Sequence, residues 1–415
     1  MRQSRRIKLK ILDDDFKFVD LFSGIGGFHY AMKKFSPNAI CVKASEINKN
    51  AISVYKENFG IDSSADICEI KVEDFEKFDV LCAGFPCQSF SKAGHRKGFS
   101  DSRGVLFNQI ERIIKDKISI NEKPKILILE NVKNISTHDN GNTWQIIRNK
   151  LENLDYNVVK EPIISSPSDY GIPQKRQRAI ILAVDKKIYS DNLDFNIRKT
   201  NERKISLDEI FENDSPELKK YDITAKDLDV LNMWDDFIDR IGKKLIGFPI
   251  WSFEFGNKDN INHYPLWKQN FILKNRKLYD DNKEKIDVWK EKYKPHLYIK
   301  TFQKFEWQVG DDIDSVFEGY IQFRPSGIRV KRPDEVLPTL VAMVHTPIIG
   351  NKKRYITPRE AARLQSFPEN FKFDSVGEDI YRLLGNAVNV EVIFNVFSDF
   401  VNFLERKTSY VNKEN

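Results

Sequence analysis

The first half of the chain alternates short apolar runs with segments of helical spacing. The five apolar runs lie at residues 16–22, 39–46, 78–85, 124–131 and 179–184. Between them, residues 104–117 and 142–154 look like helices. Strands alternating with helices predict an open, mostly parallel α/β sheet. The run ILIL at 126–129 has no polar member, as expected of a strand buried on both faces.

This alternation stops near residue 185. Residues 190–325 are rich in Lys, Asp, Asn and aromatic side chains. Five of the six tryptophans lie there: Trp234, Trp251, Trp267, Trp289 and Trp307. The change of composition predicts a separate module, and we expect most of these tryptophans to fill its core. Helix-like segments return at 357–367 and 385–404, so the first module is expected to be discontinuous.

The amino-acid composition restricts the class of protein but does not identify its function. The chain has 415 residues, of which 40% are hydrophobic and 31% charged, as is ordinary for a soluble protein with a sizeable core. The net charge of +6 is compatible with a polyanionic partner but does not require one. No CxxC pair and no HExxH motif occur, so we expect no metal site and no disulfide framework.

The same features bear on location. The basic N-terminus is not followed by an apolar stretch, and no run of eighteen apolar residues occurs. We therefore expect neither a secretory signal nor a membrane span. The four cysteines fit a reducing cytosolic compartment.

A glycine turn follows the first apolar run. The segment DLFSGIGGF at 20–28 places Gly24, Gly26 and Gly27 where backbone can approach a ligand closely. Glu46 ends the next strand, where a carboxylate commonly holds a ribose diol, and Asp66 could bind an adenine edge. A tight turn with surface acids explains the same residues. No GK[ST] follows, so a phosphate-binding P-loop is not indicated.

One cysteine stands out by its surroundings. Cys87 follows Pro86 at the end of an apolar run, and residues 88–104 are rich in Gly, Ser, Lys and Arg. Such a segment cannot bury a core of its own, and it is basic enough to close over a phosphate backbone. Cys87 is therefore a candidate nucleophile. Taken alone, a cysteine at this position is more commonly a buried small hydrophobe, as we expect of Cys41 and Cys82.

Seven segments together resemble the cytosine-C5 DNA methyltransferase family, in the order usual for that family. They are DLFSGIGGF (20–28), FPCQSFS (85–91), DSRGVLF (101–107), ENVKN (130–134), QKRQR (174–178), RVKRPDEVLPTL (329–340) and GNAV (385–388). The likeness covers residues 16–184 and roughly 326–404. It implies an α/β, Rossmann-like S-adenosylmethionine-dependent methyltransferase domain with a smaller target-recognition domain. Ala387 stands where the family often has Ser.

The resemblance also implies a division of the chain. Residues 1–15 would be an N-terminal arm, 16–189 the catalytic domain, 190–345 the target-recognition domain and 346–415 a return to the catalytic domain. Aromatic side chains interleaved with Lys, Arg and Asn could read or stack on bases. The basic segment 323–333 is expected to lie along DNA. The recognised sequence does not follow from these residues.

Family likeness assigns roles to particular side chains. It implies the catalytic residues Cys87, Glu130, Arg176 and Arg178. It implies that the cofactor S-adenosyl-L-methionine is held by Phe22, Ser23, Gly24, Ile25, Gly27, Glu46, Ile47, Asp66, Ile67, Pro86, Leu106, Asn386, Ala387 and Val388. The residues expected at the DNA substrate are Gln88, Ser89, Ser91 and Asn131. Carbon 5 of cytosine is a poor nucleophile, and addition of a thiolate at C6 of a flipped-out base would activate it.

The resemblance also implies a substrate and a partner, and it leaves other functions open. We expect a cytoplasmic bacterial monomer that acts on duplex DNA, with a cognate restriction endonuclease as a functional partner. A tRNA cytosine-5 methyltransferase would use the same cysteine, and a catalytically silent DNA-binding homologue would share the fold. The large middle module favours duplex DNA, and the intact Cys87, Glu130, Arg176 and Arg178 favour catalysis. An NAD-dependent oxidoreductase would leave Cys87 and QKRQR unexplained.

Overall fold

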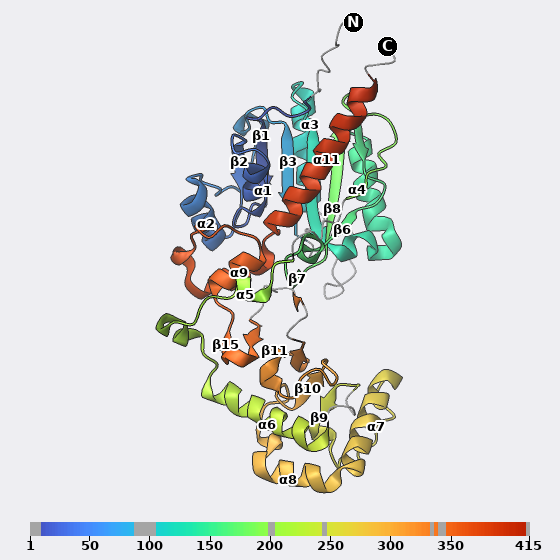
Figure 1. Ribbon diagram of the computed structural model, residues 1–415. Coiled ribbons are helices and arrows are strands. Elements are labelled where there is room, and N and C mark those ends of the chain that lie inside the picture. The colour runs from blue at the N-terminus through green and yellow to red at the C-terminus, as the bar shows by residue number, and fades with distance from the viewer. Residues whose placement is uncertain are drawn as a thin grey trace, which may run out of the picture. The chain divides into compact units, whose positions relative to one another are not determined.

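A computed structural model describes residues 10–86, 105–197, 204–242, 247–332, 336–338 and 346–411. The chain forms two compact units. The first comprises Met1–Ile210 and Ala361–Asn415, and the second comprises Phe211–Glu360 (Figure 1). Residues 190–210, expected in the target-recognition domain, group with the first unit, and residues 346–360 group with the second.

The first unit is built on a seven-stranded sheet in the order β2-β1-β3-β4-β8-β5, with β6 also paired to β8. The strands are β1 (Lys17–Leu21), β2 (Ile40–Ser45), β3 (Val80–Gly84), β4 (Ile126–Val132), β5 (Tyr156–Val158), β6 (Ile163–Ser165) and β8 (Arg178–Asp185), and β7 (Gln174–Lys175) precedes β8. All five expected strands are present. Strands β2, β1, β3 and β4 are parallel, and β8 runs antiparallel to β4, β5 and β6. Six of the seven strands therefore run in the same direction, as expected of a mostly parallel sheet, and β8 is the one reversed strand.

Register brings the ends of three strands to one edge of this sheet. Leu21 pairs with Ala83 across β1 and β3, and Gly84 pairs with Glu130 across β3 and β4. The glycine turn after β1, the chain after β3 and the end of β4 therefore share an edge. In open α/β sheets, ligands bind beyond the carboxyl ends of the strands.

Helices accompany the sheet of the first unit. They are α1 (Gly27–Phe35), α2 (Lys49–Phe59), α3 (Val105–Ser119), α4 (Asn142–Glu152), α5 (Leu207–Ile210), α10 (Ile380–Asn386) and α11 (Val390–Val411), and α9 (Pro358–Leu364) crosses the boundary between the units. Helix α11 comes from the C-terminal part of the chain and lies beside α1 (Figure 1). The discontinuity expected from the sequence is thus built into the first unit.

Helix α11 belongs to a segment, Asp374–Thr408, that is long and apolar enough to cross a membrane by length and composition. Its apolar stripe is buried within the unit, with Val396, Phe400 and Leu404 fully covered. Phe397 packs edge-on against Phe35 of α1, with ring centroids 5.0 Å apart. This packing is that of a core helix.

The second unit contains a six-stranded sheet, in the order β15-β14-β11-β12-β10-β9, that the sequence did not predict. Its strands are β9 (Ile250–Trp251), β10 (Lys304–Trp307), β11 (Tyr320–Arg324), β12 (Gly327–Lys331), β14 (Ile348–Ile349) and β15 (Arg354–Tyr355), and β13 (Leu337–Pro338) lies outside it. The unit also contains the helices α6 (Ala225–Ile241), α7 (Leu266–Asp281) and α8 (Lys283–Tyr293).

Tryptophans form much of the core of the second unit. Trp234 stacks on Phe305 of the sheet with ring centroids 4.8 Å apart, and its indole lies 5.5 Å from that of Trp289. Three of the five expected core tryptophans are buried, including Trp307. Trp251 is half-buried and Trp267 is 60% exposed.

Candidate active site

The glycine turn is fixed by one carboxylate. Phe22 and Gly24 adopt left-handed φ angles of 55° and 52°, which turn the chain sharply after β1. Glu46, at the end of β2, accepts a hydrogen bond from the Gly24 amide at 2.9 Å through Oε2. Its Oε1 accepts from the amides of Ile47 at 2.9 Å and Asn48 at 2.8 Å. The carboxylate thereby ties the turn to the start of the next segment.

A segment from the C-terminal part of the chain reaches this turn. A Cβ atom added to Gly27 would lie 2.6 Å from the carbonyl oxygen of Val388, so only glycine allows this approach. The Nη2 atom of Arg176 donates to the carbonyls of Gly385 at 2.9 Å and Ala387 at 2.8 Å. Arg176 is buried, and burial lowers its pKa to about 9. Its guanidinium therefore holds the segment 385–388 in place.

A cavity of about 500 Å³ opens between these elements. The expected cofactor residues that line it are Phe22, Ser23, Gly24, Glu46, Ile47, Asp66, Ile67, Pro86, Leu106, Asn386, Ala387 and Val388. Two others do not line it, because Ile25 is buried in the core and Gly27 packs against Val388.

Sequence reasoning missed further lining residues. They are Phe28, Ser45, Asn48, Ala65, Gly84, Phe85, Val132 and Gly385. Most of them neighbour a predicted residue along the chain, so proximity to a motif is the signal that could have found them.

An acid and an arginine face the same cavity. Glu130 on β4 and Arg178 at the start of β8 form an ion pair, with 3.0 Å between Oε1 and Nε. Glu130 is 8% exposed. Burial raises the pKa of its carboxyl, whereas the charges of Arg178 and Arg176 act in the opposite direction. The raised pKa favours a protonated carboxyl here, which is what a proton donor requires.

Asn131 also lines the cavity, and its side chain is engaged by the neighbouring backbone. It is buried, and its Nδ2 atom donates to the carbonyl of Phe85 at 3.1 Å. Its Oδ1 atom accepts from the amide of Val132 at 2.8 Å. The Asn131 side chain therefore fixes the backbone that leads into Pro86.

The expected nucleophile lies just beyond the described chain. Cys87 and the expected DNA-binding residues Gln88, Ser89 and Ser91 are outside the described residues. Pro86, the residue before Cys87, lines the cavity. The other three cysteines are poor candidates for a thiolate: Cys82 is fully buried within β3, burial raises the pKa of Cys41 to about 12, and the pKa of Cys68 is also raised by burial.

The fold and the cavity indicate the general class of domain to which the first unit belongs. An open α/β sheet with a glycine turn, a carboxylate after the second strand and a cavity at the carboxyl edge is the layout of a domain that binds a nucleotide-like cofactor. The buried Glu130 and its partner Arg178 line the same cavity.

Comparison with known proteins defines the family. A model of the family described as C-5 cytosine-specific DNA methylase matches residues 16–402. The chain therefore belongs to the C-5 cytosine-specific DNA methylase family.

Two relatives match along nearly their whole length. The Type II methyltransferase M.HgiCI of Herpetosiphon aurantiacus is 35% identical over 435 residues, covering 92% of this chain and 97% of the relative. The Type II methyltransferase M.BanI of Aneurinibacillus aneurinilyticus is 34% identical over 422 residues, covering 92% and 95%. The solved structure of the Entamoeba histolytica methyltransferase EhMeth shares the fold, with a TM-score of 0.57 and 19% identity over 94% of this chain and 99% of its own.

Proposed function

We propose that this protein transfers a methyl group from S-adenosyl-L-methionine to carbon 5 of a cytosine in a specific duplex DNA sequence. One observation carries the proposal: a single cavity is lined both by the glycine turn with Glu46 and by the Glu130–Arg178 pair. A cofactor region and an acid–arginine pair thus open into the same space, beside the residue that precedes Cys87.

The cavity fits the proposed methyl donor. Glu46 and Asp66 offer carboxylate oxygens to hydroxyl and amino groups, and Ile47 and Ile67 offer apolar surface to a purine ring. Backbone of the glycine turn is open for close approach, since a Cβ atom added to Gly24 would meet nothing within 4 Å. When bound, S-adenosylmethionine supplies a methyl group on a sulfonium, which is an electrophile.

Cys87 is proposed to make the cytosine reactive. Its thiolate adds to C6 of the base, and the electron pair of the C5–C6 double bond then becomes available at C5. After C5 is methylated, the C5 proton passes to solvent, and the electron pair of the C5–H bond re-forms the C5–C6 double bond as the thiolate is expelled from C6. The proton that N3 receives from Glu130 during the addition then returns to Glu130, which restores the neutral base. Asn131 supports this role by fixing the Phe85 carbonyl two residues before Cys87.

Glu130 is proposed to protonate N3 of the cytosine as the thiolate adds. Its raised pKa keeps a proton on the carboxyl over a wider pH range than an exposed glutamate would. Arg178 orients the carboxyl through their 3.0 Å contact and carries further donors that can meet the base carbonyl. Arg176 is a positioning residue, because its guanidinium binds the carbonyls of Gly385 and Ala387.

The remaining assignments follow the family and its relatives. We propose that Phe211–Glu360 is the unit that recognises the target, and that the enzyme flips the cytosine out of the duplex before reaction. The two relatives described are Type II methyltransferases. By analogy, we propose a cytoplasmic bacterial monomer whose methylation protects host DNA from a cognate restriction endonuclease.

A methyl-transfer assay tests the activity. Duplex DNA from a host lacking cytosine methylation and unmodified tRNA are each incubated with the enzyme and S-adenosylmethionine, and bisulfite sequencing locates any 5-methylcytosine. We expect methylation at one sequence motif in DNA only. Methylation of tRNA alone, or of neither, would overturn the proposal.

The covalent step has its own test. Cys87→Ala should abolish methylation, whereas Cys68→Ala, at an exposed cysteine outside the cavity lining, should retain it. A duplex with 5-fluorocytosine at the target should trap a covalent complex with the wild-type enzyme, because no C5 proton can leave. A Cys87→Ala variant that still methylates would show that the nucleophile is wrong.

A further inference from the structure

The sheet of the second unit has two unlike faces. Side chains alternate along β10, β11 and β12, so that Phe305, Ile321 and Ile328 point into the apolar core. The opposite face of the same three strands is polar. It carries Lys304, Glu306, Gln322, Arg324, Arg329 and Lys331.

Three of these polar residues form a row across the strands. Gln322 of β11 is paired in register with Arg329 of β12, and Arg329 is paired with Glu306 of β10. Directly paired residues place their side chains on the same face, with Cβ atoms about 5 Å apart. Arg324 is two positions beyond Gln322 and therefore lies on this face too.

Glu306 holds both arginines. Its Oε1 accepts from Nη2 of Arg324 at 2.7 Å. Its Oε2 accepts from Nε of Arg329 at 2.8 Å and lies 2.7 Å from Nη2 of the same side chain. One carboxylate thus fixes two guanidinium groups, and the face retains a positive charge.

Each arginine has a nitrogen that Glu306 does not bind. The Nε atom of Arg324 is buried and has no hydrogen-bond partner among the residues that the structure describes. Nη1 of Arg329 and the side-chain amide of Gln322 also make no hydrogen bond within the described part of the chain. Gln322 is only 7% exposed, whereas the side chains of Arg324 and Arg329 are 19% and 25% exposed, so the two arginines are the members of the row that DNA can reach.

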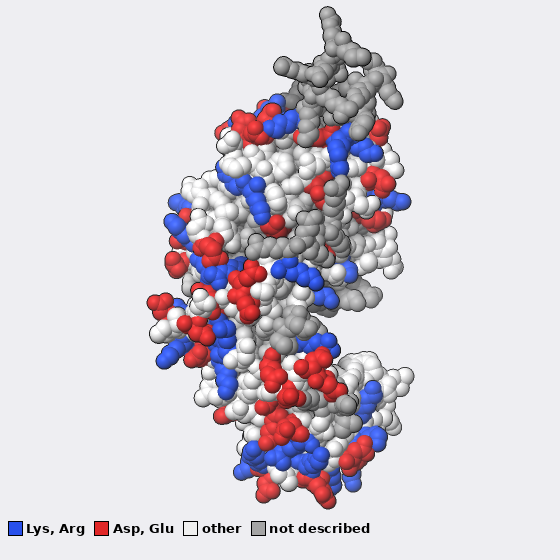
Figure 2. Space-filling model, in the orientation of Figure 1, with Lys and Arg blue, Asp and Glu red and all other residues white. Residues whose placement is uncertain are grey.

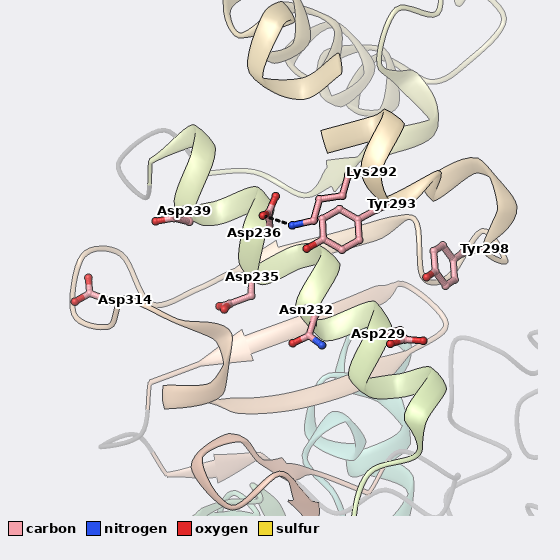
Figure 3. A pocket seen from close by; sticks show the side chains of 9 residues that line it. All are labelled: Asp229, Asn232, Asp235, Asp236, Asp239, Lys292, Tyr293, Tyr298 and Asp314. Carbon is pink, nitrogen blue, oxygen red and sulfur yellow. Dashed lines mark hydrogen bonds and ion pairs between the residues drawn. The ribbon is translucent and has the colours of Figure 1, made fainter. Parts of the chain in front are cut away.

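The other side of the unit is acidic. Helix α6 packs its apolar side on the sheet through Trp234 and Phe237. The outward side of α6 carries Asp229, Asp235, Asp236 and Asp239, which line a groove of about 630 Å³ (Figure 3). In the view of Figure 2, acidic side chains gather over the second unit. This side would repel a phosphate backbone.

We propose that Arg324 and Arg329 determine target specificity by reading base edges, with Glu306 as the residue that positions both arginines. The inference rests on the proposed DNA methyltransferase function and identifies which side chains of the second unit select the sequence. The sequence predicts only that residues 323–333 lie along DNA, whereas this proposal assigns base contacts to particular side chains.

The residue types match the chemistry of base edges. A guanidinium can donate two hydrogen bonds to O6 and N7 of guanine. Such contacts require a fixed orientation, which an arginine held by a carboxylate has before DNA arrives. A lysine at the same position keeps the charge but cannot form the two-pronged contact.

The principal alternative is that the Arg–Glu–Arg group only joins three strands. Then Arg→Lys substitutions would change stability and leave the choice of sequence unchanged. If the arginines contact phosphates alone, substitution would weaken binding equally for all sequences. These alternatives make different predictions about specificity.

The test compares the sites methylated by Arg324→Lys, Arg329→Lys and wild-type enzyme in a plasmid library. Arg240→Lys is the matched control, because Arg240 pairs with Asp236 on the acidic side of the same unit. We expect at least one of the two sheet variants to lose about 10-fold or more of its discrimination at one base position. The control should methylate the wild-type set of sites.

Each outcome decides something different. Identical site preferences in all variants, or a uniform loss at all sites, would overturn the inference. A wild-type enzyme that methylates no cytosine would instead overturn the proposed function. For a variant without turnover, the ratio of its affinities for target and non-target duplexes replaces the site comparison. An unchanged ratio refutes the inference, and a lowered ratio at one base position supports it.

Discussion

Replacing Glu130 by glutamine separates the chemical role of this carboxyl from its structural one. Glutamine has nearly the same shape and keeps an oxygen that can accept from Arg178, but it cannot transfer a proton. The structure places the carboxyl in the cavity, 8% exposed and 3.0 Å from the Arg178 Nε atom. Removal of a general acid typically costs about 10²–10⁴-fold in rate. We expect a loss of methyl transfer of this size.

The same substitution should not lower the stability of the protein near pH 7, although it lowers the rate of methyl transfer. At 3.0 Å and an effective dielectric constant of about 20, the gross attraction between Glu130 and Arg178 is about 5 kcal/mol. The pKa of Glu130 is nevertheless raised, so the penalty for burying its charge exceeds the help from both arginines. The protonated carboxyl therefore contributes stability below its unfolded pKa, and this contribution is lost as pH rises through the folded pKa.

The glutamine variant lacks this titration. The wild-type protein should thus lose stability relative to Glu130→Gln as pH rises from about 4 toward 7, where the variant should be at least as stable. Thermal melts across this range measure the difference, and single-turnover methylation measures the chemical step. Full activity in the variant would refute the proton-donor role. A variant markedly less stable at pH 7 would show that the ion pair is structural.

Three further substitutions test how the cavity is held. Asn131→Ala removes the donor to the Phe85 carbonyl and should lower the free energy of unfolding by about 1–3 kcal/mol in urea titrations. It should also lower the turnover rate, and an unchanged turnover rate would contradict the positioning role of Asn131. Gly27→Ala places a Cβ atom 2.6 Å from the Val388 carbonyl and should cost about 1–3 kcal/mol by the same measurement. Glu46→Gln should weaken S-adenosylmethionine binding in calorimetry while DNA affinity persists; equal weakening of both would argue against a cofactor role.

The sheet of the first unit was largely predictable because its strands are buried on both faces. A run such as ILIL within β4 contains no polar residue, and its length suits a strand. The direction of β8 was not predictable, since an antiparallel neighbour buries AIILAV as completely as a parallel one would. The short strands β5 and β6 have only three residues each, too few to show a period.

The second sheet was missed for a related reason. Its strands have two to five residues, and KFEW of β10 alternates only twice. Pairing of β10 with β12 depends on the intervening chain returning beside it, which no local pattern encodes. The polar row that includes Gln322 and Arg329 exists only after this pairing.

The sequence motifs predicted which residues lie at the cavity, but not which atoms those residues contact. The motif position of Glu130 placed it at the cavity, where it does lie. The partner of Asn131 is the Phe85 carbonyl, 46 residues earlier in the chain, and the motif gave no sign of it. Arg176 binds carbonyls more than 200 residues later, in the segment 385–388. Such contacts depend on how strands and the C-terminal segment meet.

Three glutamates show how environment, rather than residue type, sets the task of a carboxyl in this protein. Glu46 accepts three backbone N–H bonds and so fixes a turn that lines the cofactor region. Glu130 accepts no backbone N–H bond that the structure records and is buried beside arginine, which raises its pKa and favours proton transfer. Glu306 lies between two arginines on the polar face of the second sheet and orients both. Because these surroundings come from different elements, exchanging the tasks would require rebuilding the backbone around each carboxyl, not only its neighbours.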